Sequence, residues 1–526
     1  TTGWASLPTW NRDDFAKVFK VVPELGLILF PFQGWDQKNY RYLSAVQLID
    51  YARDSLTRRG RIEDGGWVER GIPHGENTVL TISSTGFQVM DIADRDQPRL
   101  RGKLELARNV QQLAIPSVPS AEEFTVQLAG DWYRGNAEVL TTPIDDPDAA
   151  EPLGKIRIAA PYGRMFTNGT LAAVASIQAV EREDGTTAQA SKVQVVDLAD
   201  PSSPRLRGEV TLPEPVWVGY HNWYWGWGDE VVQVNSTTLV FHRYFDWWRC
   251  LNCLMDGGAV EEEPYQMLYL VDLEDPDRPV VASTVSLPDV DWAWGIKASG
   301  SMLYLTVYRT REESPGAWVT RYFLRRFEVS DPARPVELAE VNIPGMFIDA
   351  SPDGQTLYTQ ELFCSSSGGT HTAFYVLALQ GDQAYLQSKV ETPGYLNNVL
   401  VAGSAAFATS YWWEVKVVDG RQVWDNKSFL MTIDLRDPRA VRIAGQAELP
   451  FDYAYLQTVV GRRAFLGSYA GIFVYDIYEL SRPTFDQFLR TQGWSQEIVV
   501  HGERAYVPSG YHGVQVLELG GGAGTP

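Results

Sequence analysis

Aromatic side chains crowd two neighbouring stretches in the middle of the chain. Indole faces on loops could stack on sugar rings or bind a partner protein, with a histidine adding a polar contact. The same side chains could instead fill the space between adjacent sheets. Both interpretations stay open, and the first predicts an aromatic patch that binds a ligand or partner. Its residues are Trp217, Tyr220, His221, Trp223, Trp225 and Trp227, followed by Trp247 and Trp248.

Three cysteines offer a second kind of chemistry. Cys250 and Cys253 have the spacing of a redox pair or of half a zinc site. A redox pair is expected at a helix start, however, and no nearby Cys or His pair would complete four zinc ligands. Haem attachment would need a histidine where Leu254 stands. We therefore predict a local disulfide between Cys250 and Cys253 that holds a long loop in an oxidising compartment. Cys364 is expected to be buried and inert.

Histidine positions give no clear metal site. A central channel could gather several of them around a metal, but no spacing indicates this, and we predict no metal site and no cofactor. Nucleophile elbows, phosphate loops, metalloprotease helices and EF-hand loops do not occur in the sequence. No catalytic residue can therefore be assigned. The histidines are His74, His221, His242, His371, His501 and His512.

Charge excludes some partners. The 526 residues include 45 Lys and Arg against 66 Asp and Glu, so the formal net charge is −21. Such a surface would be repelled by nucleic acid and by anionic lipid. No run of about 18 apolar residues occurs, so no membrane span is predicted. The chain begins Thr1-Thr2-Gly3 without an initiator Met, which is typical of a processed or trimmed N-terminus. Nothing in the sequence indicates an oligomeric state.

The elements that must position these residues form a repeat. Val193 to Gly208 reads as an apolar strand that ends in Asp197, an Asp-Pro turn, a second proline and a strand of alternating side chains. A degenerate unit near residues 143–156 makes a tenth copy plausible. The acids that end the apolar strands are expected to bind turn amides, which is a structural role. The marker positions are Asp50, Asp91, Asp197, Asp272, Glu328, Ala378, Asp434, Asp476 and Glu518.

Two further strand-like runs precede each marker, so each unit holds four short strands. Four strands with tight turns need about 42 to 50 residues, which is the period of a propeller blade. We predict an all-β fold in which residues 1–519 form a single large β-propeller of four-stranded blades. Nine or ten blades are counted, and eight blades with insertions or two smaller rings stay open. The N-terminal strand, within residues 3–10, is expected to complete the last blade and close the ring.

Interruptions of the repeat are expected to lie in surface loops. They fall near residues 107–150, 213–228, 245–265, 308–320 and 411–427. Residues 520–526 have the composition of a flexible, glycine-rich tail.

The units resemble the LVIVD-type repeats of bacterial and archaeal secreted β-propellers. In that family an apolar strand ending in Asp is followed by a Ser/Ala-Asp-Pro-x-x-Pro turn, and the match here is close at Val193–Gly208 and Leu270–Val280. The copies near residues 378 and 143 have lost the Asp. The resemblance implies a propeller and a secreted, extracellular or cell-surface setting, with the periplasm as an alternative. It carries over no catalytic residue.

These observations favour an extracytoplasmic β-propeller that acts as a non-enzymatic binding or scaffold module. Rigid blades with variable insertions suit this task, because the scaffold holds loops whose composition can change. Another surface protein or a glycan is the expected partner of the Trp-rich loops. The alternative is a propeller enzyme, a lyase, hydrolase or oxidoreductase, with its site at the central channel.

Overall fold

The computed structural model consists almost entirely of β-strands joined by turns. In the part of the chain that it describes, one 3-10 turn, η2 (Pro23–Leu25), interrupts the strands. No helix among these residues is long and apolar enough to cross a membrane. The described residues are 5–6, 18–36, 41–64, 66–118, 122–130, 136–159, 163–181, 185, 187–216, 218, 231–243, 266–287, 292–314, 317–364, 370–418, 421–450, 454–493 and 497–520.

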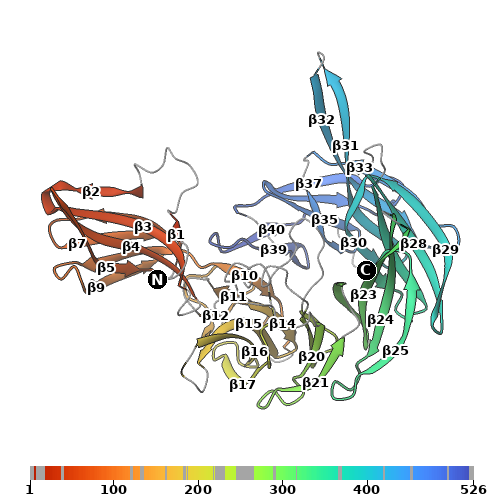
Figure 1. Ribbon diagram of the computed structural model, residues 1–526, viewed down its shortest axis with the longest axis horizontal. Helices are drawn as coiled ribbons and strands as arrows, with labels where there is room; N and C mark the ends of the chain where they lie inside the picture. The colour runs from red at the N-terminus through yellow and green to blue at the C-terminus, as the bar shows by residue number, and fades with distance from the viewer. Residues whose placement is uncertain are drawn as a thin grey trace. The chain divides into compact units, whose positions relative to one another are not determined.

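Forty strands in this part of the chain form ten sheets, which are numbered here in chain order (Figure 1). Sheet 1 holds β1 (Ala5–Ser6), β2 (Lys20–Val22), β3 (Leu27–Asp36), β4 (Arg41–Ala52) and β5 (Ser55–Glu63). Sheet 2 holds β6 (Val68–Pro73), β7 (Thr78–Ser83), β8 (Gly86–Asp91) and β9 (Arg99–Glu105). Sheet 3 holds β10 (Val110–Ala114), β11 (Phe124–Gly130), β12 (Ala137–Pro143) and β13 (Gly154–Ile158). Sheet 4 holds β14 (Gly163–Asn168), β15 (Leu171–Glu181), β16 (Thr187–Asp197) and β17 (Arg205–Thr211).

The next five sheets repeat the same strand order. Sheet 5 holds β18 (Val231–Gln233), β19 (Thr238–Arg243), β20 (Gln266–Asp272) and β21 (Val280–Leu287). Sheet 6 holds β22 (Trp292–Ser299), β23 (Met302–Ser314), β24 (Ala317–Glu328) and β25 (Val336–Ile343). Sheet 7 holds β26 (Met346–Ala350), β27 (Thr356–Cys364), β28 (Thr370–Gln380) and β29 (Gln383–Pro393). Sheet 8 holds β30 (Tyr395–Ala402), β31 (Ala405–Val418), β32 (Arg421–Asp434) and β33 (Arg442–Glu448). Sheet 9 holds β34 (Tyr455–Val460), β35 (Arg463–Ser468), β36 (Gly471–Asp476) and β37 (Thr484–Arg490).

The last sheet is shorter. Sheet 10 holds β38 (Val499–His501), β39 (Arg504–Pro508) and β40 (Val514–Glu518) among the described residues. The strands of one sheet follow one another along the chain and pair antiparallel. This order confirms the predicted all-β fold of repeated four-stranded blades.

The core lies between consecutive sheets. In sheet 7, Leu357 and Leu377 pack against sheet 6, whereas Tyr358 and Val376 pack against sheet 8. A strand that is buried on both faces needs apolar residues at successive positions, which explains the continuous apolar runs of the sequence. The marker residues stand at the ends of the third strands, as Asp91 does in β8 and Asp434 in β32.

The chain forms two compact units. The first comprises Thr1–Arg207, Pro213–Pro215 and Tyr506–Val516, and the second comprises Gly208–Leu212, Val216–Ala505 and Leu517–Pro526. Within the first unit, a segment from the end of the chain contacts sheet 3. The Val110 N–H donates to the Gly510 carbonyl at 3.0 Å, and the Val514 N–H donates to Asp148 Oδ1 at 3.4 Å.

The tenth repeat is a complete sheet. Residues 107–150, expected to interrupt the repeat as an insertion, contribute β10, β11 and β12 of sheet 3. The marker acid is replaced by Pro143, but Asp146 still accepts the N–H of Ala149 on its carbonyl in the following turn. Residues 308–320 and 411–427 continue the strand pairs β23–β24 and β31–β32 as long hairpins.

The described part of the N-terminal strand pairs in sheet 1. Ala5 and Ser6 pair with Gly34 and Gln33 of β3 in sheet 1, so these two residues add no strand to the last sheet. The rest of residues 3–10 lies outside the described residues, and the expected closure of the ring stays a prediction. β2 pairs only with Leu27–Leu29 of the ten-residue strand β3, which leaves the far end of that edge for β1. Pairing within one sheet also closes a short loop, which costs less chain entropy than joining the two ends of the chain.

Candidate functional site

The predicted aromatic patch lies outside the described residues. This holds for Trp217, Tyr220, His221, Trp223, Trp225, Trp227, Trp247 and Trp248, and also for the predicted disulfide partners Cys250 and Cys253. Their assignments therefore stay predictions. The structure does describe the strands that these stretches connect.

Strand order gives each sheet two distinct ends. In an antiparallel sheet, the connection from the second to the third strand leaves at the same end as the connection to the next sheet. We call this the open end. The two remaining connections, from the first to the second strand and from the third to the fourth, leave at the opposite end, which we call the turn end. Residues 212–230 join β17 to β18 and residues 244–265 join β19 to β20, so both Trp-rich stretches begin and finish at open ends.

Neighbouring sheets of the second unit keep these ends aligned. Near the open ends, the Leu396 N–H of sheet 8 donates to Thr372 Oγ1 of sheet 7 at 3.1 Å. At the turn ends, Ser283 Oγ of sheet 5 donates to the Pro332 carbonyl of sheet 6 at 2.6 Å, and Ser388 Oγ repeats this contact with Pro438 at 2.7 Å. The long connections of adjacent sheets therefore leave on one common side.

The marker acids accept hydrogen bonds in the turns at the turn end. Asp197 Oδ1 accepts the Ala199 N–H at 2.9 Å, while Oδ2 binds Arg205 and Arg207 at 3.0 and 3.1 Å. Burial alone would raise the pKa of Asp197, but the hydrogen bonds from the Ala199 amide and the two guanidinium groups outweigh it and lower the pKa. The same bond to the N–H two residues later occurs at Asp91, Asp272, Glu328, Asp434 and Asp476. The predicted structural role of these acids is confirmed.

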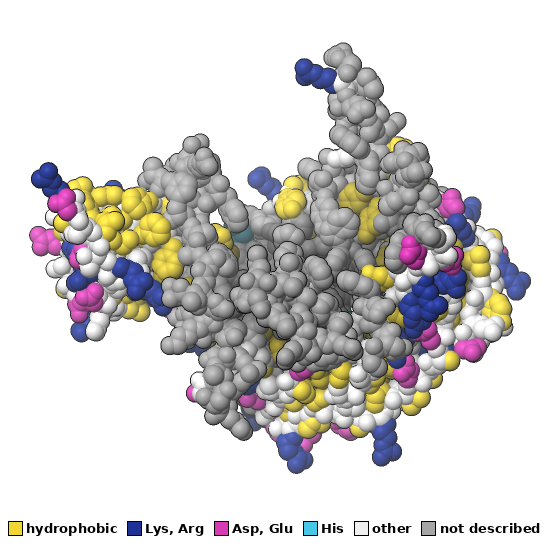
Figure 2. All heavy atoms as spheres, viewed as in Figure 1, with side chains coloured by type: hydrophobic (Ala, Val, Ile, Leu, Met, Phe, Trp, Pro, Cys, Tyr) yellow, Lys and Arg dark blue, Asp and Glu magenta, His cyan; other side chains and the backbone are white. Residues whose placement is uncertain are grey.

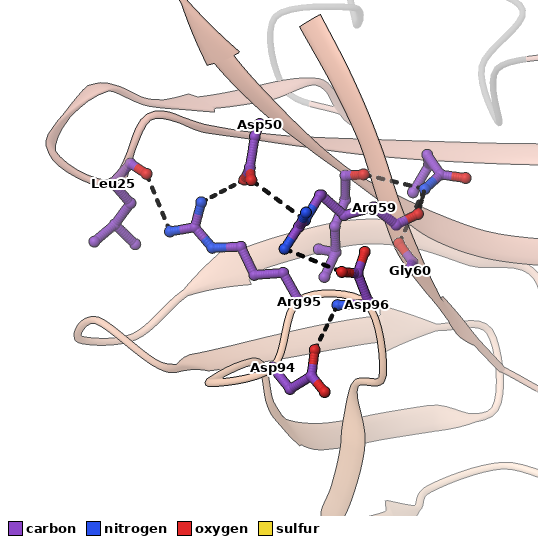
Figure 3. Close-up of polar contacts among 9 residues, drawn as sticks. Leu25, Asp50, Arg59, Gly60, Asp94, Arg95 and Asp96 are labelled. Atoms are coloured by element: carbon purple, nitrogen blue, oxygen red, sulfur yellow. Dashed lines mark hydrogen bonds and ion pairs between the residues drawn. The ribbon is translucent and has the colours of Figure 1, made fainter.

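A four-residue ion cluster joins sheets 1 and 2 at their turn ends (Figure 3). Asp50 lies between Arg95 of the sheet 2 turn and Arg59 of β5, whose Nε is 3.3 Å from Asp50 Oδ2. Arg59 continues to Asp96 at 3.1 Å, and Arg95 donates to the Leu25 carbonyl at 3.0 Å. Every charge in the cluster has an opposite charge beside it, so its role is to hold the two sheets together.

Glycines of the outer strands make room for these turns. A Cβ on Gly154 would lie 2.4 Å from the Pro201 carbonyl oxygen of the next sheet, and one on Gly445 would lie 2.5 Å from that of Leu480. Thr432 Oγ1 donates to the same Leu480 oxygen at 2.5 Å. The turn end is thus tightly packed by backbone and leaves little freedom for a variable site.

Tyrosines gather at the open ends of sheets 8 and 9. Tyr395 pairs with Tyr411 across β30 and β31, and the Tyr411 hydroxyl donates to the Ala454 carbonyl at the start of sheet 9. Gln457 Nε2 donates to the Tyr455 hydroxyl at 2.8 Å. Burial raises the pKa of Tyr455, and the nearby Tyr411 and Tyr469 hydroxyls raise it further. We call Tyr395, Tyr411, Tyr455, Gln457 and Tyr469 the tyrosine cluster.

Exposure differs within this cluster. Tyr469, in the connection between β35 and β36, is 77% exposed, whereas Tyr455 is half-buried. Close by along β31, the Trp412 ring lies 6.2 Å from the Phe429 ring and 5.7 Å from Lys427 Nζ. Aromatic rings with polar handles are suited to bind sugars or protein side chains.

A second aromatic group lies at the open ends of sheets 6 and 7. The Tyr308 and Tyr322 rings are 5.9 Å apart, and the Tyr375 hydroxyl donates to Glu361 Oε2 at 2.8 Å. Burial, followed by the hydrogen bond to the Glu361 carboxylate, raises the pKa of Tyr375. Tyr375 is therefore a neutral donor at physiological pH. Sequence reasoning singled out the tryptophans and missed these tyrosines, which lie in the middle of long strands and have no local sequence signal.

His242 and Gln266 close the base of the 244–265 connection. His242 is the second-to-last residue of β19, and Gln266 is the first residue of β20. The His242 Nε2 and Gln266 Oε1 atoms are 2.9 Å apart. Complete burial lowers the pKa of His242 to about 4. The ring is therefore uncharged at neutral pH, and as the Nε2–H tautomer it donates to the Gln266 amide oxygen. No group of three or more His, Cys, Asp or Glu side chains that could hold a metal occurs among the residues described.

Comparisons with known proteins add little beyond the fold. No family model matches the chain, and no curated protein matches its sequence. Among solved structures, the chain is similar to a crystal structure of the tricorn protease, with a TM-score of 0.35 and 9% sequence identity over 95% of this chain. The chain spans about half the length of that protein, since the match covers 49% of it.

Proposed function

We propose that this chain is a non-enzymatic binding or scaffold module that recognises its partner with aromatic side chains at the open ends of its sheets. The tyrosine cluster carries the proposal. It combines an exposed ring, half-buried rings and polar handles on two adjacent sheets of one unit. The strand order adds that both Trp-rich stretches leave their sheets at open ends.

A glycan or another surface protein is the partner that this chemistry favours. Tyrosine and tryptophan rings offer flat apolar faces, and their hydroxyl or indole groups supply directional hydrogen bonds. The net charge of −21 disfavours nucleic acid. The likeness of the repeats to the LVIVD type supports an extracytoplasmic setting on a cell surface, in the medium or in the periplasm. A disulfide between Cys250 and Cys253 would fit the same setting.

Binding of the full chain to a glycan array and to candidate surface proteins tests the proposal. Sheet 9 offers a matched pair of variants, because Tyr469 at the open end is 77% exposed and Tyr478 at the turn end is 73% exposed. We expect Tyr469→Ala, Trp223→Ala and Trp225→Ala to weaken binding about tenfold or more, and Tyr478→Ala to leave it unchanged. Equal losses from Tyr469→Ala and Tyr478→Ala would contradict the proposal.

Metal and cofactor analysis of the purified chain separates this proposal from the enzyme alternative. The binding module is expected to carry no stoichiometric metal and no chromophore. A metal or a bound chromophore at one per chain would favour a propeller enzyme with a site at its central channel.

A further inference from the structure

Sheets with a neighbour on each side bury both of their faces. In sheet 7, Leu357 and Leu377 on one face and Phe374 and Val376 on the other are almost completely buried. Among the described residues, one core cluster joins sheet 1 to sheet 2 and another joins sheet 3 to sheet 4. Sheets 1 and 2 pack on each other as a pair, and each of them has a second face that points away from the other.

The outward face of sheet 2 is apolar. On the inward face, Val79 and Met90 pack against sheet 1. Side chains alternate across a strand, so their neighbours point the other way. We call this outward set the trailing face, and its members are half-buried or exposed rather than buried: Leu80, Ile82, Phe87, Val89, Leu104 and Leu106.

One sequence motif shows that a trailing face normally carries a partner. β9 begins Arg99-Leu100-Arg101-Gly102 and β17 begins Arg205-Leu206-Arg207-Gly208, with the same four residue types. A Cβ on Gly208 would lie 2.6 Å from Pro279 Cδ in the turn of sheet 5, whereas a Cβ on Gly102 meets no described atom within 4 Å. The outer strand at Gly102 therefore has the same residue types that pack against a neighbouring sheet at Gly208, but no described atom packs there.

The residue at the end of the outer strand also differs in exposure between sheet 2 and the other sheets. Leu106, which follows β9, is 65% exposed. Its counterparts in the eight other sheets that have an outer strand are between 0% and 7% exposed: Asp64, Ile158, Leu212, Leu287, Ile343, Thr392, Leu449 and Thr491. In sheet 8, Leu449 is covered by Ala454 and Leu456 of the next sheet.

The outward face of sheet 1 is apolar as well. Leu27, Leu29 and Leu48 are fully buried against sheet 2, but the alternate residues are half-buried or exposed. We call these the leading face: Val21, Ile28, Phe30 and Ile49. Ile28 pairs with both Val21 and Ile49, so they share one surface. Figure 2 shows hydrophobic side chains gathered over β3 and β4 in this part of the molecule.

We propose that a second copy of this chain covers these faces, with the trailing face of sheet 2 in one copy packed on the leading face of sheet 1 in the next. The chain already builds this kind of interface within itself, because the trailing face of one sheet packs on the leading face of the next sheet. The pair of sheets 1 and 2 exposes one face of each kind, so two copies complement each other. Such a contact is heterologous, because the two surfaces differ, and it leaves a free face at each end of a dimer.

The size of the faces fits a reversible association. Each apolar face is the width of one sheet, which is at the small end of specific interfaces, about 1,000 Å² or less in total. Interfaces of this size give modest affinity, so assembly is expected to depend on concentration between about 1 and 100 µM.

Sedimentation velocity of the full chain across this range tests the proposal. The wild type is expected to shift to dimers and longer chains as concentration rises. Leu106→Asp on the trailing face and Phe30→Asp on the leading face are each expected to weaken association about tenfold or more. Leu386→Asp on the outer strand of sheet 7, where Leu386 is 58% exposed, is the matched control and should associate like the wild type.

Mixing the two variants identifies the direction of the contact. Leu106→Asp keeps an intact leading face and Phe30→Asp keeps an intact trailing face, so an equimolar mixture should form a dimer that grows no further. Melting curves establish that each variant is folded, and Leu106→Ser is a milder variant of a position that is already exposed. A wild type that stays monomeric, or a mixture that fails to dimerise while both variants are folded, overturns the proposal.

Discussion

Single residues at the turn end are fixed by several partners at once. Asp197 accepts one backbone N–H and two guanidinium groups, and its carboxylate is nearly buried. The residue acts through geometry, since the turn that it holds is the part of each sheet that reaches the neighbouring sheet. This is why an acid recurs at so many markers although no reaction needs it.

Substitutions of Asp197 separate the two kinds of bond. Asp197→Ala removes the turn bond and both ion pairs, and is expected to cost about 1 to 3 kcal/mol of unfolding free energy. Asp197→Asn keeps an acceptor for the Ala199 N–H and should cost less than the alanine variant. Urea unfolding at pH 7 measures both. Equal losses for the two variants would show that the turn bond contributes nothing.

His242 predicts a pH dependence of stability. Its folded pKa of about 4 lies below the unfolded value of 6.5, so the unfolded state takes up the proton first. The contribution of His242 to the free energy of unfolding keeps its full value above pH 6.5. It decreases by up to about 3 kcal/mol as the pH falls toward 4. The urea midpoint should therefore fall between pH 7 and pH 5 in the wild type and fall less in His242→Gln. The same slope in both proteins would contradict the assignment.

Consecutive sheets pack through contact between the outer strand of one sheet and the turn before the outer strand of the next sheet. Gly208 and Gly102 occupy the same place in β17 and β9, but only at Gly208 would a Cβ clash with the next turn, at 2.6 Å from Pro279 Cδ. Gly208→Val is expected to cost about 1 to 3 kcal/mol through overpacking, and Gly102→Val should leave the stability of the monomer nearly unchanged. Thermal unfolding of dilute protein compares them. A larger loss at Gly102 would mean that its surroundings are not open.

The N-terminal element gives a second test at this scale. β1 contributes two residues to the edge of sheet 1. Deleting residues 1–10 should therefore change the melting temperature by a few degrees or less, since the two described residues among them form only a short edge pairing in sheet 1. A large drop would mean that the segment supports more of the fold than this edge.

Sequence periodicity predicted the sheets because the third strand of most repeats ends at an acid, and prolines and glycines mark the turns. It recognised the tenth repeat only as plausible, since Pro143 has replaced its marker acid. It could not predict that Ala5 and Ser6 join sheet 1, because free edges of many sheets compete for an N-terminal strand. The tyrosine cluster was also missed, because Tyr411 and Tyr455 come together from strands whose sequence separation carries no signal.

At the scale of the molecule, the chain unites sequence-distant segments within its first unit. Asp148 is partly buried beside the C-terminal segment, where a Cβ on Gly513 would lie 2.1 Å from its carboxylate oxygen. Burial raises the pKa of Asp148, while the bond from the Val514 amide opposes this effect. Asp148→Ala is expected to speed amide hydrogen exchange at residues 510–514 and to leave the sheet 9 strands unaffected. Unchanged exchange at Val514 would mean that this contact does not hold the segment.

The molecule divides its tasks between two ends of its sheets. Turn ends are filled by acids, prolines and glycines that join one sheet to the next, whereas open ends carry the long connections and the tyrosines. The long connections at the open ends can vary without changing the contacts between sheets at the turn ends, which suits a scaffold that presents a binding surface.

Hydrogen exchange of the full chain with and without its bound glycan or protein partner tests this division most directly. We predict protection on binding at the open ends, at Tyr455–Gln457 and at residues 467–470, and no change in the turns at 435–440 and 477–482. Protection confined to those turns, with the tyrosine cluster unaffected, would contradict the account.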